Sequence, residues 1–210
     1  MLKRRSIVKS VSSKPLACAI GALFLLCSLS GAATIITLEQ VGGDVVATTS
    51  GTVDLTGLTF VTTVNGGATL VDPAHGVLEF HGGGLDEYTG ITGPASFGSG
   101  GTAVPSSKSG DDFALISYVP MIQVPFGYVS GTLLSGTATW DSTTLTALGV
   151  TPGTYTWTWG TGAAADSLTL YAGVNPPATA PEPGSLLLLS TGFAALGGFA
   201  VRKRGTSNSR

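Results

Sequence analysis

The chain is 210 residues long, 43% of its residues are hydrophobic and only 10% are charged, and its formal net charge is −2. This small net charge is the sum of three regions with very different charges. Residues 1–33 carry five cations and no acids, and residues 184–210 carry four cations and no acids. Residues 34–183 carry all twelve acids and Lys108 as their single cation, a net charge of −11. Because proteins bind nucleic-acid phosphates through Lys and Arg, this balance excludes a nucleic-acid-binding protein.

Residues 1–33 have the pattern of a signal peptide. Basic residues dominate the start, an apolar run follows at 17–29, and small residues at 30–33 suit signal peptidase. We expect a helical signal peptide that is cleaved after Ala32 or Ala33. A lipoprotein is the competing interpretation because Cys27 lies near the end of the run, but Leu26 stands where a small residue is wanted. Both cysteines fall inside this segment, so the exported part has no thiol for disulfide or thiolate chemistry.

The region from 34 to 173 consists of short, β-rich runs separated by glycines. In the clearest run, Tyr155, Trp157 and Trp159 alternate with threonines, so we expect Trp157 or Trp159 in the core. Leu168 and Leu170 return on the next strand. Further expected strands lie at 34–39, 44–49, 58–64, 75–82, 113–119 and 128–140.

Many short strands with Gly and Pro turns predict an all-β domain over 34–173, an antiparallel, jelly-roll-like β-sandwich, with a barrel as the near alternative. Residues 142–149 predict one helical turn that Gly149 ends. Residues 90–112 predict a long loop that is either functional or poorly ordered. Residues 174–183 form a Pro-rich linker.

The stretch 184–201 contains eighteen residues without a charge. As a helix it would span roughly 27 Å at 1.5 Å per residue, close to the bilayer core of about 30 Å. Arg202, Lys203 and Arg204 follow as a basic stop, which predicts a cytoplasmic tail at 202–210 and a body outside the membrane. A permanent anchor is one interpretation. The Gly- and Ala-rich second half favours a segment that another membrane protein grips.

Just before this run stand Pro181, Glu182 and Pro183. The Pro-Glu-Pro element, the apolar run and the basic cluster together resemble the PEP-CTERM sorting signal of exported bacterial proteins. The resemblance implies that exosortase, an integral membrane cysteine peptidase, recognises these three residues and processes the tail. It also implies a precursor anchored in the inner membrane and a mature protein at the cell surface or outside the cell.

Two metal hypotheses follow from the acidic body. On an extended strand His75, Glu79 and His81 would share one face, and imidazole and carboxylate ligands suit Zn²⁺. The acidic pairs at 86–87 and 111–112 could hold Ca²⁺ weakly. Solvated polar surfaces produce the same patterns, so we expect no bound metal or other cofactor beyond weak Ca²⁺ contacts.

The sequence predicts no catalytic residues. It contains no G-x-S-x-G serine, no cysteine in the body and no phosphate-binding loop. With no catalytic residues predicted, the resemblance to PEP-CTERM proteins implies the expected function, a non-catalytic exported surface or matrix protein that associates with exopolysaccharide. The alternative is a carbohydrate-active or metal-dependent hydrolase on a sandwich scaffold, which would need a pocket with two carboxylates and a Trp platform.

Overall fold

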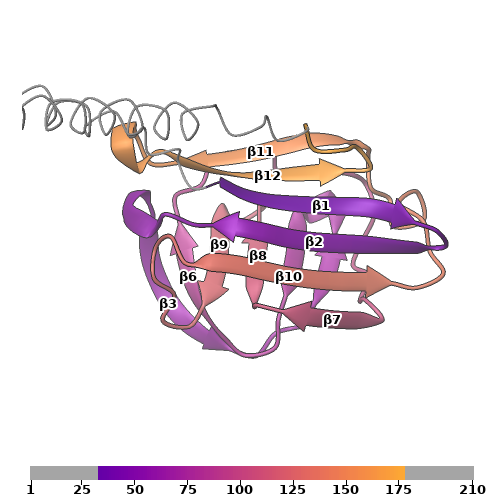
Figure 1. Cartoon of the computed structure of the whole chain (residues 1–210), viewed down its shortest axis with the longest axis horizontal. Coiled ribbons are helices and arrows are strands. Elements are labelled where there is room, and N and C mark those ends of the chain that lie inside the picture. The colour runs from indigo at the N-terminus through magenta and orange to yellow at the C-terminus, as the bar shows by residue number, and fades with distance from the viewer. Residues whose placement is uncertain (1–32, 178–210) are drawn as a thin grey trace, which may run out of the picture. The chain divides into compact units, whose positions relative to one another are not determined.

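A computed structural model describes residues 33–177 and shows two β-sheets packed face to face (Figure 1). These residues contain strands and short 3₁₀ turns but no α-helix. The all-β sandwich is therefore confirmed. The expected signal-peptide helix at 1–33, except its last residue, and the expected membrane helix at 184–201 lie outside the described residues. Within 33–177 no helix has the length and apolar character needed to cross a membrane.

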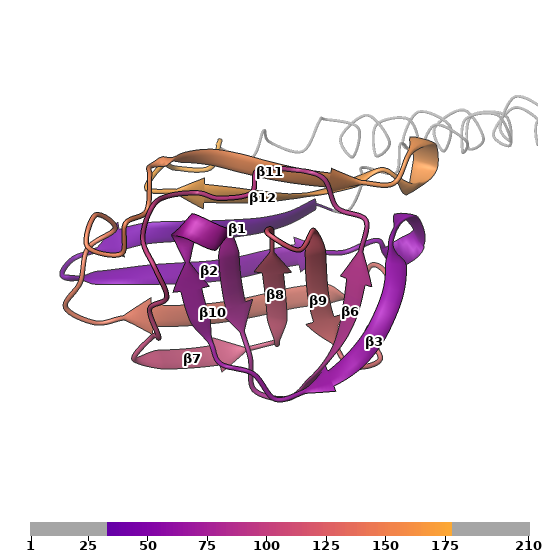
Figure 2. The same ribbon diagram turned by 180° about the vertical axis from the view of Figure 1, so that it is seen from behind.

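Each sheet has six strands, and the strands of one sheet cross those of the other, as the view from behind shows (Figure 2). Sheet A has the spatial order β11 (Gly153–Trp159), β12 (Asp166–Ala172), β1 (Ala33–Val41), β2 (Asp44–Thr52), β10 (Leu133–Trp140) and β7 (Ser107–Gly110). Sheet B has the order β3 (Thr59–Asn65), β6 (Gly84–Thr89), β9 (Met121–Pro125), β8 (Phe113–Ile116), β5 (Val77–Phe80) and β4 (Leu70–Asp72).

The expected antiparallel pairing holds for every neighbouring pair of these strands except β1 and β12, which run parallel. In that pair Ala33 lies opposite Ser167 and Leu38 lies opposite Ala172. A jelly roll has eight strands in two Greek keys. This sandwich has twelve, and its first and last strands are neighbours inside one sheet.

The core between the sheets contains the residues that strand alternation points inward. Trp157 and Trp159 are both buried, as predicted, and Leu168 and Leu170 are completely buried beside them. Phe80 fills the core from sheet B. Because a buried indole N–H needs an acceptor, the three tryptophans donate to backbone carbonyl oxygens of the connecting segments: Trp140 to Ala103 (3.1 Å), Trp157 to Pro94 (2.9 Å) and Trp159 to Asp54 (2.8 Å).

The segment 90–112 differs from the expected structureless loop. Its last part forms strand β7, and its first part makes paired backbone hydrogen bonds between Thr92 and Thr158, both 2.9 Å. Ile91 and Phe97 are buried. Sequence periodicity missed this because two large apolar side chains and two tryptophan acceptors fix a segment that otherwise consists of small residues.

The predicted helical turn is confirmed. The Leu148 amide donates to the Thr144 carbonyl at 3.0 Å, and the Thr144 hydroxyl accepts from the Ala147 amide. Gly149 ends the turn with a φ of 68°, in the left-handed region that favours glycine.

Candidate functional sites

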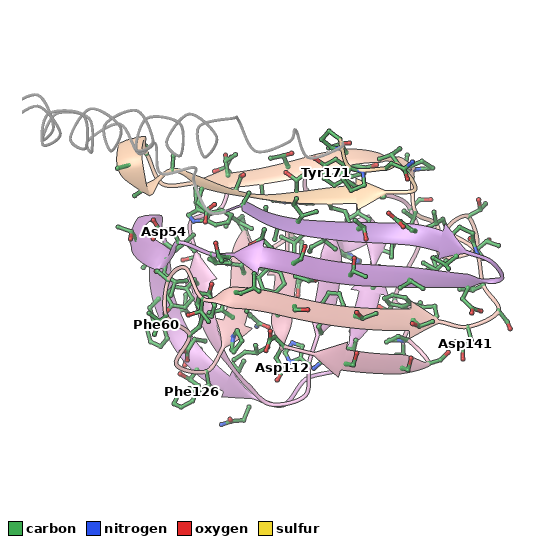
Figure 3. The ribbon with its side chains drawn as sticks, in the orientation of Figure 1. Asp54, Phe60, Asp112, Phe126, Asp141 and Tyr171 are labelled. Carbon is green, nitrogen blue, oxygen red and sulfur yellow. The ribbon has the colours of Figure 1, made fainter. Side chains whose placement is uncertain are left out.

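The outer face of sheet A carries rows of hydroxyl groups. Strand pairing aligns one residue from each of the six strands in a single row: Thr154, Tyr171, Thr37, Thr48, Thr137 and Ser109. Five strands contribute to a second row: Thr156, Thr169, Ile35, Ser50 and Ser135. We call these eleven residues, ten with a hydroxyl group and Ile35, the hydroxyl face. Figure 3 shows Tyr171 on β12.

The hydroxyl face results from the alternation of inward and outward side chains along each strand. In β11 and β12, exposed or half-buried residues regularly separate the buried ones. Neighbouring hydroxyls bond each other, at 2.6 Å between Thr37 and Thr48 and 3.2 Å between Thr156 and Thr169. Strand spacing of about 4.8 Å and a residue repeat of about 6.8 Å along a strand make the rows a regular array. Neither row contains a charged residue.

A second candidate site is a groove at the β4 edge of sheet B, on its outer side. The groove has a volume of about 440 Å³ and is lined by Leu70, Asp72, His75, Val77, Glu79, Thr102 and Tyr118. We call it the β4 groove. The 3₁₀ turn Pro73–His75 shapes it: Asp72 caps the turn by accepting from the His75 amide at 3.3 Å. Gly76 ends the turn with a φ of 61°.

Asp72 is a fully engaged carboxylate. Besides the His75 amide it accepts from the Thr102 hydroxyl at 3.0 Å, and its Oδ2 lies 3.1 Å from His75 Nδ1. Burial acts to raise the pKa of Asp72, but these hydrogen bonds together outweigh it, so the pKa is lowered. Asp72 therefore stays ionised in mildly acidic solution.

Glu79 is the opposite case. Its side chain is only 17% exposed, and its nearest ionisable neighbour is His81, with 3.9 Å between Oε2 and Nε2. Desolvation by burial raises the pKa of Glu79. The groove thus holds one carboxyl group that hydrogen bonds keep ionised and one whose ionisation burial opposes.

His81 and Gln123 lie buried behind Glu79 on the same face of sheet B. The His81 side chain is 5% exposed, and burial lowers the pKa of its imidazole more than the nearby Asp112 raises it. Gln123 donates to Glu87 Oε1 at 2.6 Å. The Nδ1 atom of His81 and the Oε1 atom of Gln123 are buried without a hydrogen-bond partner.

The three residues considered as Zn²⁺ ligands, His75, Glu79 and His81, do not form a set. The 3₁₀ turn and Gly76 interrupt the strand, so His75 pairs with Asp72 while His81 is buried beyond Glu79. Across residues 33–177, no three His, Cys, Asp or Glu side chains are grouped to hold a metal ion.

The acidic pairs expected to contact Ca²⁺ are also divided. Asp86 accepts from the Thr63 hydroxyl and the Gly127 amide, whereas Glu87, its neighbour on the strand, accepts from Gln123. Consecutive strand residues point to opposite faces, so these two carboxylates cannot chelate one ion together. Asp112 forms an ion pair with Lys108, and Asp111 accepts from the Ser135 amide at 2.9 Å.

Sequence reasoning missed most of the β4 groove. Only His75 and Glu79 were singled out, and for a metal site. The sequence does contain a signal for Asp72. An Asp directly before a Pro is a typical cap of a short helical turn, and here that turn ends at His75. Thr102 and Tyr118 come from distant segments, and only the tertiary fold brings them to the groove.

The sorting residues Pro181, Glu182 and Pro183 and the basic stop Arg202, Lys203 and Arg204 lie outside the described residues. Comparison with known families nevertheless identifies this part of the chain, because residues 179–204 match the PEP-CTERM protein-sorting motif. No curated protein and no solved structure matches the chain. The motif implies export, a C-terminal membrane anchor before processing, and processing by exosortase. The resemblance noted in the sequence is thus confirmed, and the chain carries the PEP-CTERM sorting motif of exosortase substrates.

Proposed function

We propose that this protein is a non-catalytic surface or matrix protein that binds neutral exopolysaccharide through the hydroxyl face. The observation that carries the proposal is the uncharged hydroxyl array on a body that is otherwise acidic and is followed by a sorting motif for exported proteins. Signal peptidase would remove 1–33, and exosortase would act on the tail after the body has left the cytoplasm.

The chemistry of the hydroxyl face fits a neutral polysaccharide. Thr and Ser hydroxyls both donate and accept, so they can match sugar hydroxyls that also do both. The ring of Tyr171, on strand β12 between β11 and β1, offers an apolar surface to a sugar ring. A net charge of −11 over 34–183 repels polyanions and leaves neutral polymers unaffected.

Binding to microcrystalline cellulose, an uncharged glucan, tests this function. The triple change Thr37→Val, Thr48→Val and Thr137→Val removes three adjacent hydroxyls while keeping side-chain shape, and it should abolish co-sedimentation of the full chain held in detergent. Thr62→Val, on exposed strand β3 of sheet B, is the matched control. Equal loss with the control, or full binding by the triple variant, would show that the hydroxyl face is not the binding surface.

The tail is tested separately in cells. Glu182→Ala should leave export intact but cause full-length precursor to accumulate in the inner membrane, because the recognised element is altered. Mass spectrometry of the surface fraction gives both termini of the mature wild-type protein. Peptides from 186–210 still joined to the surface-localised body would show that the segment is a permanent anchor.

A hydrolase is the second candidate function, and one observation favours it. In the β4 groove the pKa of Asp72 is lowered and that of Glu79 is raised, the pattern that separates a base from an acid. Against it, no tryptophan lines the groove, and the three tryptophans are all buried. Release of reducing ends from a polysaccharide by wild type, lost in Glu79→Gln, would favour the hydrolase over the binding protein.

A further inference from the structure

We propose that the β4 groove binds the protonated amine of an amino sugar, so that the protein recognises partly deacetylated, amino-sugar-containing polysaccharide in addition to neutral chains. This inference deepens the proposed exopolysaccharide association and rests on it for its biological meaning. The groove and the hydroxyl face lie on different sheets, so the two binding activities can be measured apart.

The shape and lining of the groove suit one or two sugar rings. Its volume of about 440 Å³ falls within the usual range for small-ligand pockets of about 300–1,000 Å³. Leu70 and Val77 provide an apolar wall. Tyr118, 60% exposed, packs edge-to-face against His75 with 5.8 Å between ring centroids, which leaves aromatic surface for a sugar ring or a cation.

The charges of the groove select a cation. Asp72 and Glu79 are both carboxyl groups, and neither Lys nor Arg lines the groove. Lys108, the one cation within the described part of the chain, is paired with Asp112. His75 and Thr102 engage only Asp72, so a neutral sugar would leave the Glu79 carboxylate without a partner, and an anionic sugar would be repelled.

An ammonium fits this donor and acceptor balance better than a metal ion. An ammonium has three donors and no acceptor. Asp72 is already engaged by His75 and Thr102, whereas Glu79 accepts no hydrogen bond within the described residues and can still take one. A metal ion needs several oxygen or nitrogen ligands, and the described residues group no such set. The desolvation that raises the pKa of Glu79 would be offset by an ammonium beside its carboxylate.

The test compares two oligosaccharides with the same backbone, the β-1,4-linked glucosamine tetramer and its fully N-acetylated form, by calorimetry on the full chain in detergent. The amine-bearing tetramer should bind at least about tenfold more tightly, because N-acetylation removes the charge that a charge-assisted hydrogen bond requires. Glu79→Gln and Tyr118→Ala should each weaken that binding. Asp141→Asn changes the net charge equally at an exposed site outside the groove and should leave it unchanged.

Equal affinity for the two tetramers would overturn the inference, and so would an Asp141→Asn loss as large as that of Glu79→Gln. Binding of a lysine oligomer that Glu79→Gln abolishes, with no binding of the glucosamine tetramer, would also overturn it in favour of a basic peptide. Cellulose binding through the hydroxyl face is unaffected by any of these outcomes. Failure of the groove inference is therefore distinguishable from failure of the proposed function.

Discussion

The outer faces of the two sheets differ in how far their polar side chains are exposed to water. On sheet A many of the outward residues carry hydroxyls that stay partly in water, and some bond one another, such as Thr37 and Thr48. On sheet B the outward residues include a small apolar cluster of Val77, Ala114 and Ile116. Next to this cluster the polar side chains of sheet B lose most of their contact with water.

This difference indicates which polar side chains have the larger effect on the free energy of folding. An exposed hydroxyl exchanges a water hydrogen bond for a protein one at little net gain. A buried imidazole or amide pays desolvation and must find partners, and the His81 Nδ1 and Gln123 Oε1 atoms do not. We therefore expect mutations on the hydroxyl face to change stability little, and mutations of the buried polar side chains His81 and Gln123 on the outer side of sheet B to change stability or its pH response.

The largest effect should come from the inner side of sheet A. Trp157→Ala removes a side chain that is 1% exposed and should cost about 3–5 kcal/mol of unfolding free energy. Thr156→Ala, the adjacent residue on the hydroxyl face, should change stability by only about 0.5 kcal/mol. Chemical denaturation followed by circular dichroism measures both, and similar losses would contradict the assignment of the two faces.

The next largest effect should separate the two outer faces. Gln123→Ala leaves Glu87 without its 2.6 Å hydrogen bond and opens a cavity, so it should cost about 1–3 kcal/mol. Thr48→Ala breaks the equally short Thr37–Thr48 bond on the exposed hydroxyl face and should cost less than about 1 kcal/mol. The same denaturation experiment compares them. A Thr48→Ala cost equal to that of Gln123→Ala would remove the distinction between the faces.

A smaller effect should appear only as pH changes. Burial lowers the pKa of His81 below its ordinary 6.5, so the unfolded chain binds the proton more readily. Stability is then lost as pH falls through 6.5 toward the folded-state pKa. Asp112, Lys108, Glu87 and Glu79 surround this imidazole and remain in both proteins.

His81→Gln removes the titrating group. The melting temperature of wild type relative to this variant should therefore fall from about pH 7 to about pH 5. Thr48→Val, on the hydroxyl face, should follow wild type across the same range. Parallel curves for wild type and His81→Gln would show that the imidazole is not desolvated in the folded protein.

The smallest effect should be that of calcium. The −11 charge over 34–183 means that any salt relieves self-repulsion. Because Asp86 and Glu87 point to opposite faces, CaCl₂ and NaCl at equal ionic strength should shift the melting temperature equally. A distinctly larger shift with CaCl₂ would reveal a coordinated site that the acidic pairs do not provide.

Much of sheet A could be predicted from the sequence because its strands alternate cleanly. Trp157 and Leu168 mark the buried side of β11 and β12, and threonines mark the other side. Sheet B was harder. Strand β6 includes the polar residue Asp86 facing inward. The alternation of buried apolar and exposed polar residues fails there, because hydrogen bonds from Thr63 and Gly127 hold the carboxylate.

The β4 groove could not be predicted because it depends on long-range contacts. Val71 pairs with Ala103, and this pairing carries Thr102 to Asp72 across thirty residues of chain. Strand β4 has only three residues, too few for a periodic signal. The sorting motif, by contrast, was recognisable because its three parts follow one another directly in the sequence.

The parallel placement of β12 beside β1 has a mechanical consequence. The chain leaves sheet A after Ala172, where the Gly173 amide still donates to the Leu38 carbonyl at 2.8 Å. A force applied through residue 174 pulls β12 along its own axis, against β11 on one side and β1 on the other. The bonds of both ladders then resist in shear, all at once, instead of opening one after another. A pull on the C-terminal linker would thus load the body through a strand that is hydrogen-bonded on both sides.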